Sequence, residues 1–243
     1  MLVQTVSDER ETLEFLATAA RSNGLIAGVV GWTDLTADDV AARIARLRAA
    51  PGGQLLVGIR HQIEDEAQDW LSDPRVRAGL TAIAGAGLVY DLLVRPDQLR
   101  HAAAAIDATP RGRFVLDHAA KPPIGQPTWL DWARDIAALA RRPHVAVKLS
   151  GLVTELPTGA PLSDVAPSAG VLLDAFGPSR TMIGSDWPVC TLAADYDEVL
   201  RLGRAAVGGL DGEDEARVLA GTATAVYRLE RTHTEPDAPD DDS

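Results

Sequence analysis

Short apolar runs that end in polar or ionisable side chains recur along this chain, and each is followed by a segment long enough to form a helix. Seven such runs lie at residues 2–4, 26–32, 55–61, 89–94, 113–118, 145–150 and 181–186. Apolar strands that alternate with helices build parallel sheets covered by helices. The pattern therefore predicts an α/β protein of the parallel barrel type.

The spacers carry the periodicity of amphipathic helices. Ser7 can cap the first helix, in which apolar residues recur at helical spacing before Asn23 and Gly24 end it. Further helices are expected from about residue 37, after Pro74, after Pro96, and over 129–140, 171–176 and 196–207. A last helix over 213–229, with Leu219 and Val226 on one face, is expected to close the core.

The number of units constrains the architecture further. A closed (β/α)8 TIM barrel has eight strands in about 250 residues, one more than the seven counted. Because Met1 leads directly into strand residues, the missing unit is expected to be the first, in an N-terminally truncated chain. We predict one barrel domain over 1–231, followed by a disordered acidic tail over 232–243 that is rich in Asp and Pro.

Composition narrows the possible partners. A formal net charge of −12 without a clustered basic face argues against nucleic acids and anionic membranes. No apolar run is long enough to span a bilayer, and no signal peptide precedes the first strand. Cys190 is the single cysteine, so no intramolecular disulfide can form. The composition predicts a cytoplasmic protein that binds a small molecule. It does not decide whether the chain forms a homo-oligomer.

Asp186 is the leading candidate for a catalytic group. It follows the apolar run of the seventh predicted strand, and the carboxyl ends of barrel strands are where active sites form. If Ile183 packs outward, alternation along the strand points Gly184 and Asp186 inward. The competing interpretation is a structural aspartate that caps a helix or pairs with an arginine.

Several cations follow the other strands. Arg60, Arg95, Lys121 and Lys148 are each more often structural than catalytic when taken singly. Grouped at one rim, they predict a pocket that attracts a carboxylate, a hydroxyl-rich ring or a developing oxyanion. Trp187 could stack on a sugar-like ring, although packing beneath loops is the commoner role of tryptophan.

Four motifs in order along the chain resemble the amidohydrolase-related family. They are VGIRHQ at 57–62, FVLDH at 114–118 with Lys121 and Pro122 after it, KLSGL at 148–152 and IGSDWP at 183–188. The resemblance is closest to the lactonase branch, which includes sugar-lactone and pyrone-dicarboxylate lactonases on a (β/α)8 barrel. It extends over residues 2–229.

The resemblance implies hydrolysis of a sugar-type or carboxylated lactone by water. Asp186 matches the general base, and His118 matches a histidine that faces the lactone carbonyl. Arg60, His61 and Lys121 match positions that line the substrate pocket, which Trp187 could also flank. Taken without the resemblance, His118 could equally be a core histidine, because alternation along its strand does not decide between Asp117 and His118.

One family feature is absent. Relatives open with a His-x-His pair that polarises the carbonyl or binds a divalent metal such as zinc, and no two histidines here have that spacing. We therefore expect no organic cofactor and assign no metal ligand. Two alternatives remain: a binding-only truncated barrel, and a metal-dependent hydrolase or decarboxylase of the same superfamily.

Overall fold

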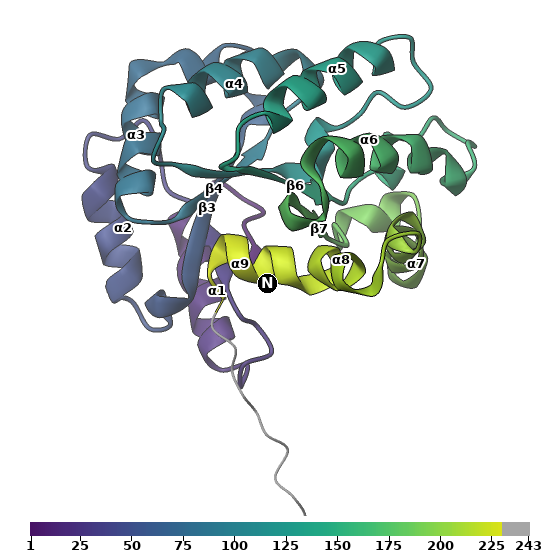
Figure 1. Cartoon of the computed structure of the whole chain (residues 1–243). Helices are drawn as coiled ribbons and strands as arrows, with labels where there is room; N and C mark the ends of the chain where they lie inside the picture. The colour runs from purple at the N-terminus through teal and green to yellow at the C-terminus, as the bar shows by residue number, and fades with distance from the viewer. Residues whose placement is uncertain (230–243) are drawn as a thin grey trace, which may run out of the picture.

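A computed structural model describes residues 1–229, and its centre is one curled sheet of seven parallel strands (Figure 1). The strands neighbour one another in chain order, from β1 to β7. They are β1 (Leu2–Val3), β2 (Val29–Gly31), β3 (Leu56–Gln62), β4 (Val89–Leu93), β5 (Arg113–Leu116), β6 (Val145–Leu149) and β7 (Thr181–Ile183). The predicted barrel-type fold with seven strands is thereby confirmed, whereas the predicted tail and its boundary at 231 lie outside the described residues.

Helices connect the strands, and those from α1 to α7 lie outside the sheet (Figure 1). They are α1 (Glu9–Ala20), α2 (Val40–Ala49), α3 (Pro74–Gly85), α4 (Leu99–Asp107), α5 (Trp129–Ala140), α6 (Ala166–Phe176), α7 (Tyr196–Val207), α8 (Gly212–Ala216) and α9 (Thr222–Tyr227). The bounds of α5 and α7 match the prediction. Within residues 1–229 none of these helices has the length and apolar character needed to cross a membrane.

The helices differ from the expectation in three places, one of which is α6, which begins at Ala166 and not at residue 171. Asp8, not Ser7, caps α1, since its side chain accepts a hydrogen bond from the backbone N–H of Arg10. The single helix expected over 213–229 is instead α8, a π-helical turn (Arg217–Gly221) and α9. The π turn inserts an extra residue into the helical repeat, which changes the face that α9 turns toward the sheet.

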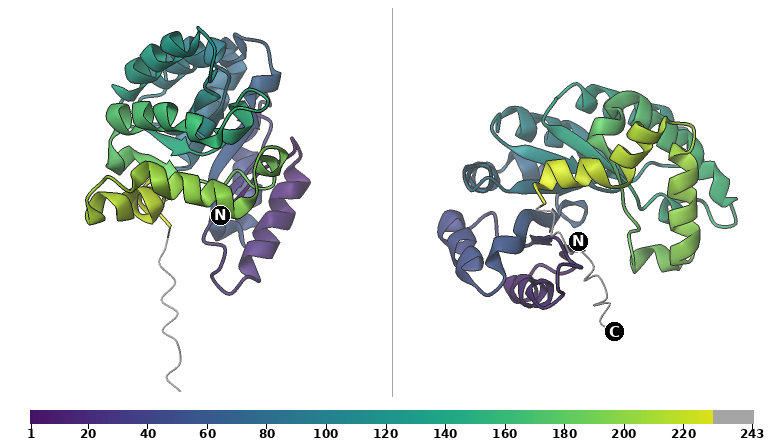
Figure 2. Two further views of the ribbon diagram at one scale, coloured as in Figure 1. Left: turned by 90° about the vertical axis from the view of Figure 1, so that its right-hand side faces the viewer. Right: turned by 60° about the horizontal axis from the view of Figure 1, so that its bottom comes forward.

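The last helix lies against the inner face of the sheet, not in the outer ring (Figure 2). Its Tyr227 packs among inward-facing strand residues that form an apolar layer: Val30, Val89, Val115, Ala146 and Met182. The guanidinium of Arg113, the first residue of β5, donates to the carbonyl of Val226. The helix α9 therefore closes the end of the sheet at which the strands begin.

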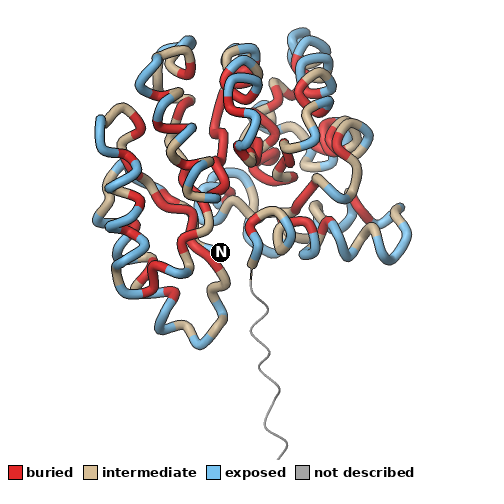
Figure 3. The backbone as a smooth tube through the Cα atoms, turned by 60° about the vertical axis from the view of Figure 1, so that its left-hand side comes forward, coloured by how far each residue is buried: buried red, intermediate tan, exposed pale blue. Residues whose placement is uncertain are grey.

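Above that apolar layer the inward-facing side chains are charged. Arg60, Asp91, Asp117 and Lys148 come from β3, β4, the end of β5 and β6, and all four are nearly or fully buried. The buried parts of the chain run along the central strands, while the exposed parts lie on the outer helices (Figure 3). A sheet with an apolar lower interior and an ionic upper interior places its chemistry at the carboxyl ends of the strands.

The fifth and seventh strands end earlier than predicted. The backbone turns left-handed at His118, with φ of 47°, and at Asp186, with φ of 56°. Left-handed backbone interrupts a β ladder and is costly for residues other than glycine, by roughly 1–2 kcal/mol each. Strain of this kind is characteristic of functional sites, where the surrounding structure holds the backbone in place.

Candidate active site

A cavity of about 140 Å³ opens at the carboxyl ends of the strands. It brings together Arg60, His118, Lys121 and Asp186, which lie up to 126 residues apart in the chain. Its full lining is Thr5, Arg60, Gln62, Glu64, Leu93, His118, Lys121, Gly151, Thr154, Glu155, Asp186 and Val189. Of the four cations predicted at the rim, Arg60 and Lys121 line this cavity.

The carboxylate of Asp186 enters this cavity from the connection after β7. Its left-handed backbone is held by a hydrogen bond in which the N–H of Cys190 donates to the Asp186 carbonyl at 2.9 Å. Gly184 provides space beside it, because a Cβ there would lie 3.1 Å from the side chain of Ser150. The local turn thus aims a half-buried carboxylate at the neighbouring strand ends.

His118 lies directly opposite that carboxylate. Its Nε2 is 3.3 Å from Oδ1 of Asp186 and 3.5 Å from Oδ1 of Asp117, while its Nδ1 is 2.9 Å from Oγ of Ser150. Because Nε2 faces two carboxylates, the neutral ring carries its proton on that nitrogen. Nδ1 is then the acceptor, and the Ser150 hydroxyl donates to it.

Gly151 allows the ring of His118 to pack this closely. A Cβ at Gly151 would lie 2.8 Å from three atoms of His118, and its φ of +67° disfavours any other residue. The imidazole is therefore enclosed by Ser150 and Gly151 on one side and by the two carboxylates on the other. Such an enclosure fixes the orientation of the ring.

The pKa values of the pair move toward each other. Burial lowers the pKa of His118 from its ordinary value, against the opposing effect of Asp117 and Asp186. Burial raises the pKa of Asp186, and the negative charge of Asp117 adds to this, against the opposing effect of His118. A neutral imidazole next to a carboxylate of raised pKa is an arrangement suited to proton transfer near neutral pH.

A buried ionic cluster lies beneath the pair. Asp117 Oδ2 accepts from Arg60 Nη1 at 2.6 Å, and Lys148 Nζ is 3.2 Å from Asp117 Oδ1 and 2.6 Å from Asp91 Oδ2. The hydroxyl of Tyr227 lies 2.8 Å from both oxygens of Asp91. Two cations and two carboxylates are thus balanced, as burial of charge requires.

Lys121 is also neutralised. Its Nζ lies 2.6 Å from Glu64 Oε2 and 3.8 Å from Glu155 Oε1, at the wall of the cavity. Burial raises the pKa of Glu155, and the charge of Lys121 opposes this. Contrary to the expectation of a cationic rim, each cation of the cavity has a carboxylate partner from the chain itself.

Four predicted residues are not part of the cavity lining, and one of them, Lys148, lies in the buried cluster beneath it. The ring of His61 points away from it: Nδ1 accepts from Trp32 Nε1 at 2.9 Å, Nε2 lies 2.9 Å from Glu66, and the ring stacks on Trp70. Trp187 is 64% exposed beside the site, not packed as the common role of tryptophan suggested. Arg95 pairs with Asp97 at 3.3 Å, outside the cavity.

The sequence reasoning missed several residues that the structure brings to the site. Glu64 and Glu155 lie after strands β3 and β6, as the predicted residues lie after their strands, and this position was the available signal. Asp91 lies inside the apolar run 89–94, and a carboxylate within a buried strand is itself a sign of function.

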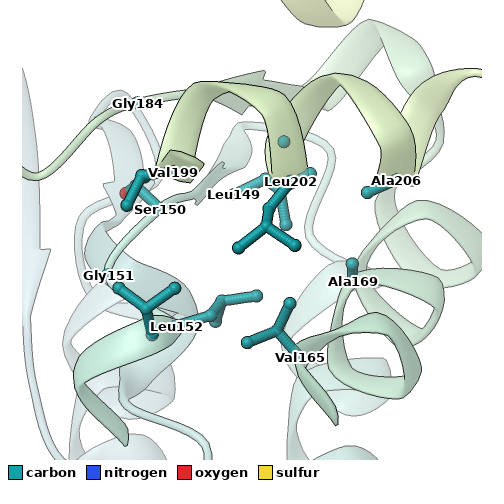
Figure 4. A pocket seen from close by; sticks show the side chains of 12 residues that line it. Leu149, Ser150, Gly151, Leu152, Val165, Ala169, Gly184, Val199, Leu202 and Ala206 are labelled. Atoms are coloured by element: carbon teal, nitrogen blue, oxygen red, sulfur yellow. The ribbon is translucent and has the colours of Figure 1, made fainter. Parts of the chain in front are cut away.

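A second, apolar cavity lies next to the polar cavity described above. It measures about 30 Å³ and is enclosed by β6, β7 and the helices α6 and α7 (Figure 4). Figure 4 shows aliphatic side chains such as Leu149, Leu202 and Val165 pointing into it. It has room for about one water molecule and few polar partners, so the larger, polar cavity is the better candidate for the active site.

Two named proteins align with most of this chain. The L-fucono-1,5-lactonase of Burkholderia multivorans is 39% identical over 233 residues, which are 90% of this chain and 77% of the relative. The L-fucono-1,5-lactonase of Burkholderia ambifaria is 38% identical over 236 residues, or 95% of this chain and 80% of the relative. The resemblance to the lactonase branch is confirmed by these two proteins.

A solved structure agrees with the fold. The crystal structure of an amidohydrolase from Burkholderia multivorans with bound zinc superposes with a TM-score of 0.87 at 38% identity. The match covers 94% of this chain and 82% of that one.

The donor set of the present chain does not fit a catalytic zinc ion. Such ions take three protein ligands, and in residues 1–229 no group of three His, Cys, Asp or Glu side chains is arranged to hold a metal. His118 and Asp186 are two donors, but the carboxylate of Asp117 is committed to Arg60 and Lys148.

A sequence model of one protein family matches nearly the whole fold and identifies the family of this chain. The amidohydrolase family model matches residues 4–229, from the end of β1 to the residues after α9. The motifs that carried the resemblance all fall within this range. With two relatives at 38% and 39% identity, the chain belongs to the amidohydrolase family and is a hydrolase of its lactonase branch.

Proposed function

We propose that this hydrolase opens a neutral, polyhydroxylated sugar-type lactone by attack of water, with Asp186 as the general base. The observation that supports this most is the pair formed by Asp186 and His118, 3.3 Å apart in a polar cavity at the strand ends. Burial raises the pKa of Asp186, which makes it a stronger base than a solvated aspartate.

The reaction needs one proton relay. Asp186 takes a proton from water, and the hydroxide adds to the lactone carbonyl carbon. We assign stabilisation of the resulting oxyanion to two donors that line the cavity. They are the Lys121 ammonium, which has three N–H groups for two carboxylate contacts, and the Nε2–H of His118, which the oxyanion would share with Asp186. Collapse breaks the bond to the ring oxygen, which takes the proton from Asp186 and leaves as an alcohol, so the product is a hydroxy acid.

The charges of the cavity favour a neutral substrate. Glu64, Glu155 and Asp186 line it, and Lys121 is paired with two of these carboxylates. Arg60 is committed to Asp117 and to Gln4. A carboxylated lactone would find no unpaired cation among the described lining residues, whereas hydroxyl groups find carboxylate, amide and threonine acceptors. The two Burkholderia relatives are named for such a neutral sugar lactone.

The test is hydrolysis of a lactone panel followed with a pH indicator. L-Fucono-1,5-lactone and other neutral sugar lactones should be opened, and pyrone dicarboxylate lactone should not. Binding of sugar lactones without turnover would support the binding-only alternative instead. A rate that requires added zinc and is lost in EDTA would support the metal-dependent alternative.

Glu64→Gln is expected to relax the preference for neutral substrates. The change releases Lys121 from the closer of its two carboxylates, so the ammonium can pair with a substrate carboxylate. We expect the ratio of kcat/KM for carboxylated over neutral lactones to rise about tenfold, which corresponds to about 1.4 kcal/mol of discrimination. The control is Glu66→Gln, because Glu66 contacts His61 outside the cavity. An unchanged ratio in Glu64→Gln would contradict the charge argument.

Ser150→Ala is expected to lower kcat about three- to tenfold near pH 7 while KM changes less than twofold. The Ser150 hydroxyl donates to Nδ1 and so stabilises the neutral form of His118. Without it the pKa of His118 rises, the ring becomes charged at higher pH, and its charge weakens Asp186 as a base. The acid limb of the kcat profile should therefore move to higher pH.

The measurement is the pH dependence of kcat together with an NMR titration of the His118 ring. Ser168→Ala is a matched control, since Ser168 is a buried serine that accepts from Trp129 Nε1 away from the cavity. Its pH profile should equal that of the unmodified chain. A pKa of His118 that does not move in Ser150→Ala would disprove the assigned tautomer.

A further inference from the structure

We infer that Tyr227, on the last helix of the fold, is a positioning residue for the active site, because its hydroxyl holds the buried Asp91–Lys148 pair that sets the charge beneath His118. This inference rests on the proposed function, since it concerns the same reaction. Tyr227 does not line the cavity and touches no reacting atom.

A continuous chain of polar contacts connects the helix α9 to the catalytic pair. The Tyr227 hydroxyl is 2.8 Å from Oδ1 and Oδ2 of Asp91, and Asp91 Oδ2 accepts from Lys148 Nζ at 2.6 Å. Lys148 Nζ is 3.2 Å from Asp117 Oδ1, which is 3.5 Å from Nε2 of His118. The contacts cross the interior from the end where strands begin to the end where chemistry occurs.

Tyr227 combines a ring buried in the apolar inner layer with a hydroxyl that reaches the ionic cluster above it. Its ring is buried in the apolar inner layer, where it lies near Gly58, the one strand position in that layer without a side chain. A Cβ at Gly58 would approach the Tyr227 ring at 3.6 Å and Val89 at 3.0 Å. The close approach of the Val89 carbonyl oxygen is therefore what favours glycine here, while the Tyr227 ring packs beside it and places its hydroxyl at Asp91.

Four charged or titratable groups act on Asp91: Lys148 from β6, Tyr227 from α9, Asp117 from the end of β5 and, across the cluster, Arg60 from β3. Burial raises the pKa of Asp91, with Asp117 adding to the rise and Lys148 and the Tyr227 hydroxyl opposing it. Loss of the Tyr227 hydroxyl raises this pKa further, because a donor to the carboxylate is removed.

The sign of the effect on catalysis follows from the charge balance. While Asp91 is ionised, Arg60 and Lys148 are matched by Asp91 and Asp117. Once Asp91 is protonated, the cluster carries one extra positive charge. Lys148 then keeps its ion pair with Asp117 but loses the one with Asp91. That charge weakens Asp186 as a base, so activity is lost as the pH falls through the raised pKa of Asp91.

The experiment compares kcat and KM of Tyr227→Phe and the unmodified chain from pH 5.5 to 9 on the best neutral lactone. We expect kcat to be about tenfold lower at the acid end and within about twofold at pH 9, with KM within about twofold throughout. Asp91→Asn should show this lower kcat at every pH, because the amide mimics the protonated carboxyl. Thermal melting verifies that both variants are folded.

Tyr90→Phe is the matched control. Tyr90 precedes Asp91 on β4, is equally buried, and its hydroxyl has no hydrogen-bond partner within residues 1–229. Its pH profile should equal that of the unmodified chain. A uniform loss across pH in Tyr227→Phe, no loss at all, or the same loss in Tyr90→Phe would overturn the inference while leaving the proposed function intact. An inactive unmodified chain would instead overturn the proposed function.

Discussion

Replacing Asp186 with Asn is expected to lower kcat for lactone hydrolysis by about 10²- to 10⁴-fold while leaving the fold intact. The amide has nearly the shape of the carboxylate but cannot take a proton from water. The side chain is close to solvent at the cavity wall and makes no buried ion pair apart from the contact with His118 at 3.3 Å. Loss of activity with unchanged thermal stability is therefore the predicted combination.

The measurement is initial rates on the best neutral lactone, with thermal unfolding followed by circular dichroism. Asp174→Asn is the control, because Asp174 is exposed on α6 and far from the cavity lining. It should keep its rate within about twofold. If Asp186→Asn retains more than a tenth of the activity, Asp186 is not the base.

Asp117→Asn has the largest expected effect on stability, a loss of about 3–5 kcal/mol in the free energy of unfolding. Asp117 is fully buried and pairs with both Arg60 and Lys148, at 2.6 and 3.2 Å. Burial alone would raise the pKa of this carboxyl, but the neighbouring His118, Lys148 and Arg60 hold it well below its ordinary value. Removing the negative charge leaves two buried cations with one carboxylate between them.

The same pKa shift sets the dependence on pH. Because the folded-state pKa of Asp117 is depressed, its contribution is fully present above the unfolded value and is lost as the pH falls toward the folded value. The difference between the unmodified chain and Asp117→Asn should therefore shrink in acid.

Urea unfolding at pH 7 and at about pH 2.5, which lies below the ordinary pKa of an aspartate, measures both effects. The control is Asp107→Asn, which breaks the exposed pair of Asp107 with Arg142, at 2.6 Å, and should cost about 0–1 kcal/mol. Equal losses in the two variants would show that the buried cluster contributes no more than a surface ion pair.

Local sequence patterns were enough for the order of the elements and for part of the site. The helices 129–140 and 196–207 were predicted to the residue, because apolar spacing along a helix depends on near neighbours. Asp186 was singled out because it follows an apolar strand, and parallel strands bring their carboxyl ends together. His118 was assigned on the family resemblance, because alternation along its strand did not decide between Asp117 and His118. The direction and neighbours of a strand are therefore readable from its own residues and spacers.

Partnerships across the interior required the tertiary structure. Arg60 turns inward to Asp117 while His61, the next residue, turns outward to Trp32, and a one-residue difference in alternation decides which of them lines the cavity. The left-handed turns at His118 and Asp186 are held by their surroundings and not by local preference.

The contact between Tyr227 and Asp91 joins residues 136 positions apart, and it depends on how α9 enters the curled sheet. By itself, the sequence determined the seven β/α units and the edge at which the chemistry collects, since those depend on periodicity and spacing. Only the packed structure decided which cations are neutralised and which carboxylate faces the cavity. Charge pairing in a buried interior is set by distances of a few ångströms between segments that are remote in the chain.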